Sequence, residues 1–412
     1  MKNIFLIASL IVLLATVLFL SSYLEVPYLG SALYYIAGPF FEERVTPEEL
    51  RSKYNSGKIK VLLVPGHDND LPGASFNGTK ESDLNVEVGY HFFDFLSQDD
   101  KFEALITREK NGDYKQWLSD YVKNDRSLVE NFREKLKSIM IDAIVKGKVK
   151  RNSVVYHNTA SNKTSLLLYS INKWANENDI DIVLHIHFND YPGRQYSAAG
   201  RYSGFSVYVP ENQLPNARAS KEVAKAIKNK LEFFFSKSDL PAESGIIIED
   251  QELIAVGSNA SRDGVSALIE YGYIYEPQFA DGNLRPATMR ELAFQTYRGV
   301  KNYFEPNKKV LHQGYDTTLL PYKWKSVLVP GLRSKDVLSL QIALLKDGTY
   351  PPSGRALSQC PISGYFGDCT TSAVKNFQEK YKDEILKPTG LINPTGNVNS
   401  LTLNKLNSLY NN

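Results

Sequence analysis

Cysteine is scarce in this sequence, with only two among its 412 residues. Cys360 and Cys369 lie close together near the C-terminus, and no further cysteine or histidine accompanies them there. This scarcity argues against a cysteine-based metal site in that region. In an exported domain, we instead expect the two residues to form a short-loop disulfide.

An excess of charge of one sign is also lacking. Lysine and arginine number 48, aspartate and glutamate number 46, and the formal net charge is +2. A protein that binds nucleic acid relies on a broad basic surface, so we expect no nucleic-acid partner. The chain is too long for one ordinary domain, so we expect two or more domains. Because 42% of its residues are apolar, these domains can bury hydrophobic cores.

A clear small-x-small cleavage site is missing after the apolar run from Ile4 to Leu20. The run is about as long as a minimal membrane-spanning helix, so we expect residues 1–24 to be an uncleaved membrane anchor. The alternative is a removed signal peptide and a secreted protein. Lys2 places the N-terminal end inside and the rest of the chain outside the cytoplasm. Residues 25–57 are then a juxtamembrane spacer.

The residues that are present centre on the stretch DIVLHIHFN, residues 181–189. Its apolar and β-branched residues predict a buried strand, in which alternate side chains share one face. His185, His187 and Asn189 therefore point the same way. Two imidazoles and an amide are costly to bury unless something binds them, and a metal ion is the usual partner.

Further polar residues stand at the ends of other predicted elements. His67 follows the strand KIKVLLV in a Pro-Gly-His turn, and Glu270 ends the apolar run of VSALIEYGYI. Glu81 stands at the front of a predicted helix, where the helix dipole favours a carboxylate even without a metal. Taken singly, His67 is also explained as a surface-loop histidine and Glu270 as half of an ion pair.

The alternation of strands and helices from residue 58 to residue 304 predicts an α/β domain, with a mostly parallel twisted sheet flanked by helices. A long, charged, mostly helical insertion occupies about residues 109–164. Residues 305–329 are polar and predict a linker. Residues 330–412 predict a small all-α domain of three helices.

Four motifs carry a resemblance to a known family: VPGHDNDLPGA, the ESDLN that begins at Glu81, HIHFN and ALIEYGY. Together they resemble the zinc-dependent N-acetylmuramoyl-L-alanine amidases of the Amidase_3 type, over about residues 58–304. The resemblance implies that His67, Glu81 and His187 bind Zn²⁺ and that Glu270 is the catalytic carboxylate. His185 stands where the family usually has serine, so it is a spectator, a residue that orients a ligand, or an extra ligand. Asn189 is a further candidate for contact with a ligand residue or the substrate.

The segments GYFGDCTTSAVKNFQ and TGLINPTGNVNSLTLNKL resemble the three-helix peptidoglycan-binding modules that are often attached to such hydrolases. Peptidoglycan is therefore the expected partner. In some members of the amidase family an insertion carries a helix that blocks the zinc, so the insertion at 109–164 is a candidate lid.

The sequence thus predicts a cell-envelope enzyme that hydrolyses the amide between N-acetylmuramic acid and L-alanine. Two histidines and a glutamate leave zinc an open position, which is typical of a catalytic site. Glu270 would move the proton from water to the leaving amine. Two alternatives remain: an inactive, membrane-anchored peptidoglycan-binding protein, and a zinc peptidase that cuts within the stem peptide.

Overall fold

The computed structural model describes residues 42–152, 160–191, 193–195, 197–306 and 316–411. The expected membrane segment, residues 1–24, and the first part of the expected spacer lie outside these residues. Among the helices that are described, none has the length and apolar character needed to cross a membrane.

The centre of the fold is a six-stranded sheet in the order β4-β1-β5-β8-β6-β7. Strand β1 (Ile59–Pro65) runs parallel to both β4 (Phe102–Ile106) and β5 (Ile182–Asn189), and β5 runs parallel to β8 (Val265–Tyr273). Strand β6 (Ser206–Pro210) is antiparallel to β8 and parallel to β7 (Ile247–Asp250). The predicted mostly parallel sheet is confirmed, with one antiparallel pair.

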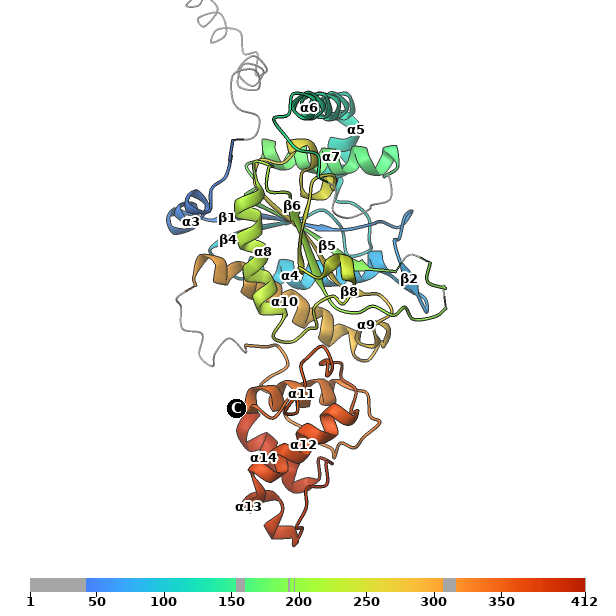
Figure 1. The fold of residues 1–412 in the computed structure, drawn as a ribbon, viewed down its shortest axis with the longest axis vertical. Helices are drawn as coiled ribbons and strands as arrows, with labels where there is room; N and C mark the ends of the chain where they lie inside the picture. Colours follow the sequence, from blue (N-terminus) through green and yellow to red (C-terminus); the bar gives the residue numbers. More distant parts are fainter. Residues whose placement is uncertain (1–41, 153–159, 192, 196, 307–315, 412) are drawn as a thin grey trace, which may run out of the picture. The chain divides into compact units, whose positions relative to one another are not determined.

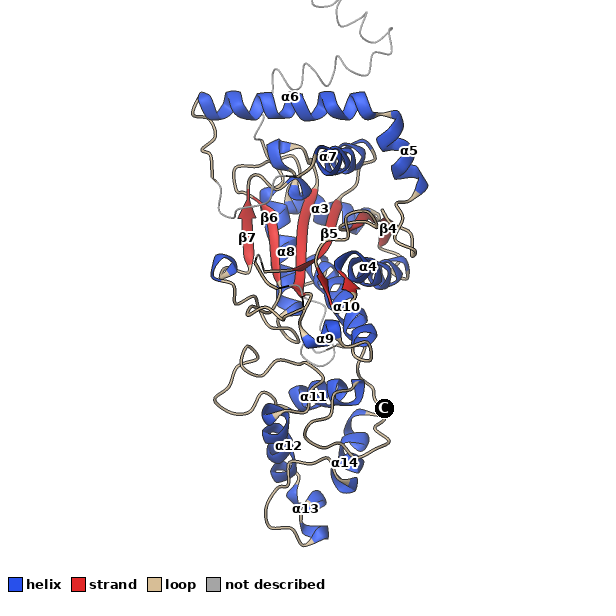
Figure 2. Cartoon of the chain, turned by 90° about the vertical axis from the view of Figure 1, so that its right-hand side faces the viewer, coloured by secondary structure: helices blue, strands red, loops and turns tan. Residues whose placement is uncertain are grey.

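Helices cover both faces of this sheet (Figures 1 and 2). One face packs against α4 (Glu81–Ser97), α8 (Ala217–Leu231) and α10 (Arg285–Phe304). The other face packs against α5 (Gln116–Asn124), α7 (Asn162–Glu177) and the 3-10 turn η2 (Ile254–Val256). Strand β5 packs against helices on both faces of the sheet because its side chains alternate between the faces. Leu184 and Ile186 point toward the face covered by α4, α8 and α10, and Val183 points toward the face covered by α5 and α7.

The insertion is helical, as predicted for residues 109–164. It contains α5 and the longer α6 (Arg126–Val145), which lies across α7 and the turn η3 (Ser258–Ala260) (Figure 2). Helix α6 buries Val129, Leu136 and Met140. Since α6 packs on α7, the insertion adds a further helical layer to this side of the sheet.

Helix α3 (Pro47–Ser56) lies where the sequence predicts a spacer. A capping box begins it, because the Thr46 hydroxyl accepts from the Glu49 amide and the Glu49 carboxylate accepts from the Thr46 amide. Leu50 and Tyr54 follow on one face and are buried. This part of the predicted spacer is therefore packed into the core, since its apolar residues recur at helical spacing.

The three helices expected near the C-terminus are present as α11 (Lys335–Asp347), α12 (Asp368–Lys380) and α14 (Ser400–Tyr410). A short helix α13 (Lys382–Ile385) and a turn η4 (Lys387–Thr389) follow α12. Cys360 and Cys369 form a disulfide, which confirms the predicted pairing.

The end of the predicted linker is not an exposed tether. Leu319, Trp324 and Leu328 are each at most 2% exposed, and the Trp324 indole donates to the carbonyl of Asp336 in α11. The apolar residues scattered between its polar ones account for this burial.

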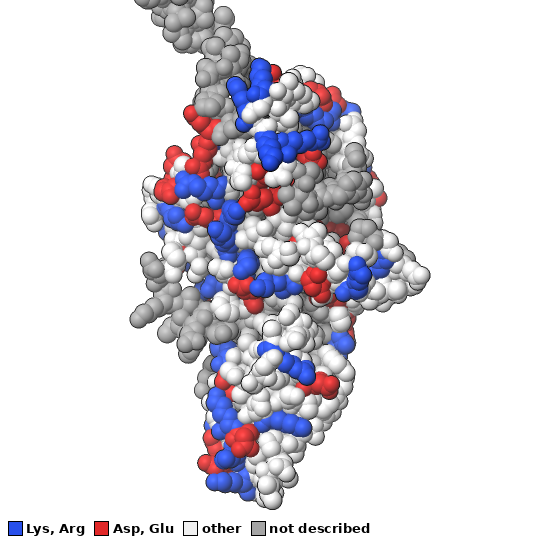
Figure 3. Space-filling view, viewed as in Figure 1, with Lys and Arg blue, Asp and Glu red and all other residues white. Residues whose placement is uncertain are grey.

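On the face drawn in Figure 3, basic and acidic side chains are interspersed.

Candidate metal centre

Three side chains from distant parts of the chain meet at the C-terminal edge of the sheet. His67 follows the end of β1, His187 lies near the end of β5, and Glu81 is the first residue of α4. One potential ligand atom from each lies within 4.8 Å of the others. Glu81 Oε2 is 3.2 Å from His67 Nε2, and Glu81 Oε1 is 3.0 Å from His187 Nδ1. The structure therefore brings together the three residues that the resemblance implies as ligands.

Glu81 is fixed by more than the two histidines. It follows the hairpin of β2 (Ser75–Phe76) and β3 (Thr79–Lys80), and its place at the start of α4 suits a carboxylate because the helix dipole is positive there. Its two oxygens also accept from the backbone amides of Ala74, at 2.9 Å, and Phe188, at 3.2 Å. The carboxylate is thus oriented before any ligand arrives.

Two glycines leave room for the three side chains. A Cβ on Gly66 would lie 2.1 Å from His187 Nε2. A Cβ on Gly73 would lie 2.3 Å from Glu81 Oε2. Gly73 also has a φ of +74°, a backbone conformation that residues other than glycine rarely adopt. The turn around His67 therefore requires glycine at both positions.

Arg108 holds the loop that carries His67. This arginine is fully buried, donates through Nε to the Gly112 carbonyl at 2.8 Å, and donates to the backbone carbonyl of His67. His67 has a φ of +60°, so its backbone occupies the left-handed region that needs support from its surroundings. Tyr114 lies against the guanidinium, and its hydroxyl donates to Asp68 at 3.3 Å. Sequence reasoning missed the role of Arg108, although a basic residue two positions after the end of β4 was a usable signal.

The carboxylate of Glu81 and the two imidazoles shift one another's pKa values. Burial by itself raises the pKa of Glu81, but the hydrogen bonds with His187 and His67 outweigh it and lower the pKa well below the usual range. Burial lowers the pKa of His187. Burial acts in the same direction on His67, but the Glu81 carboxylate outweighs it and raises the pKa. The cluster therefore favours an ionised carboxylate between two imidazoles.

Glu270 lies beside this cluster. It pairs in register with His187 on the neighbouring strand, and its Oε2 is buried with no hydrogen-bond partner within the described part of the chain. Burial is the main cause that raises its pKa, and the negative charges of Glu81 and Glu243 add to it. A buried carboxylate oxygen without a partner is costly unless a ligand supplies one.

Asn189 does not reach the cluster but binds a second buried carboxylate. Its amide donates to Glu243 Oε1 at 3.0 Å, and the Tyr208 hydroxyl donates to the same oxygen at 2.7 Å. Ser238 donates to the other oxygen. Sequence reasoning missed Glu243 because it ends the short turn η1 (Pro241–Glu243), where no strand or motif marks it.

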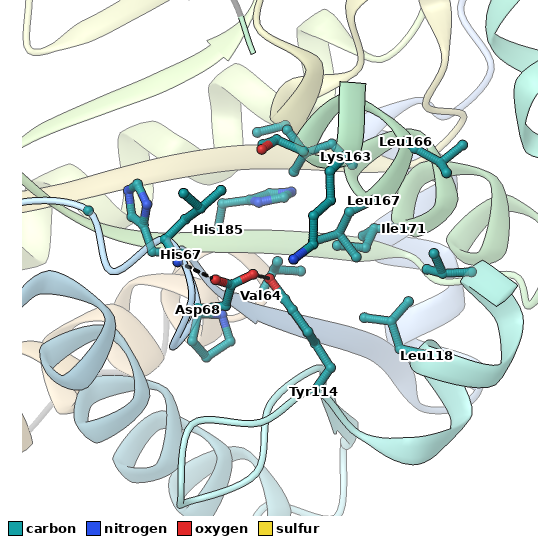
Figure 4. Close-up of a pocket in the computed structure, with 18 of the residues that line it drawn as sticks. Val64, His67, Asp68, Tyr114, Leu118, Lys163, Leu166, Leu167, Ile171 and His185 are labelled. Carbon is teal, nitrogen blue, oxygen red and sulfur yellow. Dashed lines mark hydrogen bonds between the residues drawn. The ribbon is translucent and has the colours of Figure 1, made fainter. Parts of the chain in front are cut away.

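His185 is not part of the cluster of three. It is 1% exposed, and its Nε2 is buried with no hydrogen-bond partner among the described residues. Burial lowers its pKa to about 3, so the imidazole is neutral. His185 lines a pocket of about 950 Å³ together with His67 and His187 (Figure 4).

The three residues fit a divalent metal ion. Zinc bonds nitrogen and oxygen ligands at about 2.1 Å, so a tetrahedral site places its ligand atoms about 3.4 Å apart. With one nitrogen or oxygen from each residue, the three atoms all lie within 4.8 Å of one another. The contacts of 3.0 and 3.2 Å are made by different oxygens of Glu81, so one imidazole approaches each oxygen of the same carboxylate. The fold and the site thus define an α/β protein with a candidate His-Glu-His metal centre at the edge of a parallel sheet.

Comparison with protein families identifies the class more closely. The profile of the N-acetylmuramoyl-L-alanine amidases matches residues 61–302, which is more than half of the chain. The chain belongs to this family, whose reaction is hydrolysis of the amide bond between N-acetylmuramic acid and L-alanine in peptidoglycan. The profile of a peptidoglycan-binding domain matches residues 333–406. Peptidoglycan is therefore both substrate and binding partner, and the site of action lies outside the cytoplasm.

Several amidases of known structure are similar to the chain. That of Clostridium difficile 630 is 16% identical, with a TM-score of 0.37, over 61% of this chain and 99% of that one. An amidase of Nostoc punctiforme is 15% identical, with a TM-score of 0.37, over 60% of this chain and 98% of its own. An amidase of Mycobacterium abscessus is 15% identical, with a TM-score of 0.39, over 60% of this chain and 99% of its own. A search of curated protein sequences found no match.

Proposed function

We propose that this amidase is zinc-dependent, with His67, Glu81 and His187 as the metal ligands and Glu270 as the residue that moves the proton. The observation that supports this most directly is the convergence of the three ligand atoms within 4.8 Å. Glu270 stands in register beside His187 on the next strand, so ligands and proton carrier share one edge of the sheet.

The choice of zinc rests on the donor set. Two imidazole nitrogens and one carboxylate oxygen suit zinc, and three protein ligands leave a coordination position open, as in catalytic sites. When bound, zinc supplies Lewis-acid chemistry, because it polarises a carbonyl oxygen and makes water a stronger acid. The buried Glu81 carboxylate contributes one negative charge to the ion's surroundings, and its two backbone amide donors keep it in place.

Glu270 would take a proton from the attacking water and deliver it to the amine of L-alanine as the amide bond breaks. Its buried Oε2 has no other described partner, so no ion pair competes for that proton.

The remaining assignments are part of the same proposal. Residues 58–304 form the catalytic domain, residues 330–412 bind peptidoglycan, and residues 1–24 attach the protein to the membrane of the cell envelope. Attachment at both ends would hold the catalytic domain near its polymeric substrate and raise the effective substrate concentration.

Replacement of Glu270 by glutamine tests the mechanism. The change keeps the shape of the side chain but removes the carboxylate, so we expect turnover of purified peptidoglycan to fall about 10²- to 10⁴-fold. Zinc content, measured on the same preparation, should match that of the wild-type protein. Glu103→Gln on β4, at an exposed position, is the control and should keep its activity. Turnover retained in Glu270→Gln would contradict the assigned role.

Product analysis separates the two alternatives. Amidase activity releases intact stem peptides with a free L-alanine amine, whereas a stem peptidase releases shortened stems that leave L-alanine on the sugar. An inactive binding protein would retain peptidoglycan and release neither product, with or without a chelator.

A further inference from the structure

Arg194 lies in the loop that follows β5 and is almost completely buried. Its side chain is 4% exposed, although a guanidinium carries a permanent charge and five N–H donors. Burial of such a group is costly unless its charge is paired and its donors are bonded. The proposed zinc mechanism does not use Arg194, so its burial requires another explanation.

All five donors of Arg194 are bonded. Asp190, the first residue after β5, accepts from Nε at 2.7 Å and from Nη2 at 3.0 Å. The carbonyls of Gln195 and Ala198 accept from Nη1 at 3.0 and 2.9 Å. The last donor leaves the loop, because Nη2 also donates to the carbonyl of Ser75 in β2 at 2.8 Å. A planar guanidinium can serve this many partners at once, whereas a lysine has three donors and no fixed plane.

Two aromatic rings also contact the guanidinium. Arg194 Cζ lies 5.4 Å from the ring centroid of Phe76 in β2 and 5.4 Å from that of Tyr275, which follows β8. Both rings are buried, and a cation over a buried ring is attracted to its face. Arg194 therefore joins three segments: the loop after β5, the hairpin of β2 and β3, and the chain that leaves β8.

The hairpin that Arg194 holds is the one that orients Glu81. It contains only two residue pairs, and a two-stranded hairpin of this length depends on what packs against it. Its two ends meet at Glu81, whose amide donates to the carbonyl of Ala74 at 2.9 Å. In return, the Ala74 amide donates to Glu81 Oε2 at 2.9 Å. Ala74 directly precedes Ser75, the residue that Arg194 bonds.

We propose that Arg194 is a positioning residue for the metal centre and that it acts through the hairpin that orients Glu81; this rests on the proposed function. On one side Arg194 is fixed to Asp190, which stands three residues after His187. On the other side it is fixed to Ser75, next to the amide that bonds Glu81. It therefore sets the spacing between the segments that carry two of the three ligands. A metal ion accepts ligand atoms only at short, defined distances, so this fixed spacing strengthens metal binding.

The first test measures the zinc affinity of the full chain by competition with a chelator. Arg194→Gln has two N–H donors instead of five and should bind zinc about tenfold or more weakly, the loss typical of residues that orient metal ligands. Arg194→Lys keeps the charge but not the planar fork and should lose nearly as much. Arg201→Gln, an exposed position in the same loop, makes the same change of charge and should keep the wild-type affinity. Wild-type affinity in a folded Arg194→Gln would overturn the proposal.

The second test leaves Arg194 in place and changes its partner. Asp190→Asn removes the paired charge and should also weaken zinc binding, by a smaller factor. Because Asp190 and Arg194 act as one unit, the double variant should bind zinc no more weakly than Arg194→Gln alone. Losses that multiply would mean that the two residues act independently, and would overturn the proposal. If Arg194→Gln does not fold, Asp190→Asn is compared with Arg201→Gln instead, and wild-type affinity in Asp190→Asn would then overturn it.

Hydrogen exchange in the metal-free protein keeps this inference separate from the proposed function. The peptide that covers residues 74–81 should exchange several-fold faster in Arg194→Gln, because the amides of Ala74 and Glu81 lose their fixed partners. Arg201→Gln should exchange like the wild-type protein. If the wild-type protein binds no zinc, the proposed function fails while this measurement still decides whether Arg194 holds the hairpin. Wild-type exchange in Arg194→Gln would show that Arg194 supports only its own loop, and would overturn the proposal.

Discussion

Acid should destabilise this protein in part by protonating His185. The side chain is buried and neutral in the folded state, where its pKa is about 3, against about 6.5 for the free side chain. Between these two values the unfolded chain binds the proton and the folded chain does not. The folded pKa is the lower one, so the stability is complete above about pH 6.5 and is lost as the pH falls toward 3.

The size of this loss follows from the two pKa values. At pH 5 the unfolded imidazole is almost fully protonated and the folded one almost fully neutral, so the free energy of unfolding drops by about 2 kcal/mol relative to pH 7. Between pH 8 and pH 7 the same group contributes only about 0.1 to 0.2 kcal/mol. The effect is therefore confined to the acid side of neutrality.

Urea unfolding of the full chain, in the presence of a chelator, measures this difference. Wild-type protein and His185→Gln are compared at pH 8, 7, 6 and 5. Trp117 and Trp174, whose rings lie 4.2 Å apart between α5 and α7, report on the unfolding of this region by fluorescence. We expect the wild-type protein to lose about 2 kcal/mol more than the variant between pH 7 and pH 5. Equal losses in the two proteins would refute the assignment of a buried neutral imidazole.

Three further predictions concern packing. Gly66→Ala should weaken zinc binding, measured by competition with a chelator, because its Cβ would lie 2.1 Å from His187 Nε2; unchanged affinity would contradict the geometry. Leu136→Ala on α6 should cost about 2 to 5 kcal/mol in urea unfolding, since the side chain is 1% exposed; no loss would mean that α6 is not packed. Replacement of both Cys360 and Cys369 by serine should destabilise the C-terminal helices by about 2 to 3 kcal/mol, seen as a lower melting temperature that reductant no longer changes; a melting temperature equal to that of the oxidised wild-type protein would contradict it.

Much of the fold could be predicted because the local sequence patterns agree with the structure that forms. Apolar β-branched runs predicted the central strands, and His67 and His187 could be placed at strand ends because parallel strands end at a common edge. Local pattern also misled in places. The polar residues around α3 and around Trp324 indicated a spacer and a linker, but a few apolar side chains at suitable spacing pack both segments against the rest.

The sequence by itself determined which residues were candidates for the metal site and roughly where each stands on its helix or strand, because hydrophobic periodicity and turn residues act over a few positions. Only the tertiary structure decided the distances. It brought Glu81 between the two histidines, joined Asn189 to Glu243, and turned His185 toward a pocket instead of the metal centre. These arrangements depend on contacts between residues far apart in the chain. The sequence around any one residue does not specify which distant residues pack against it.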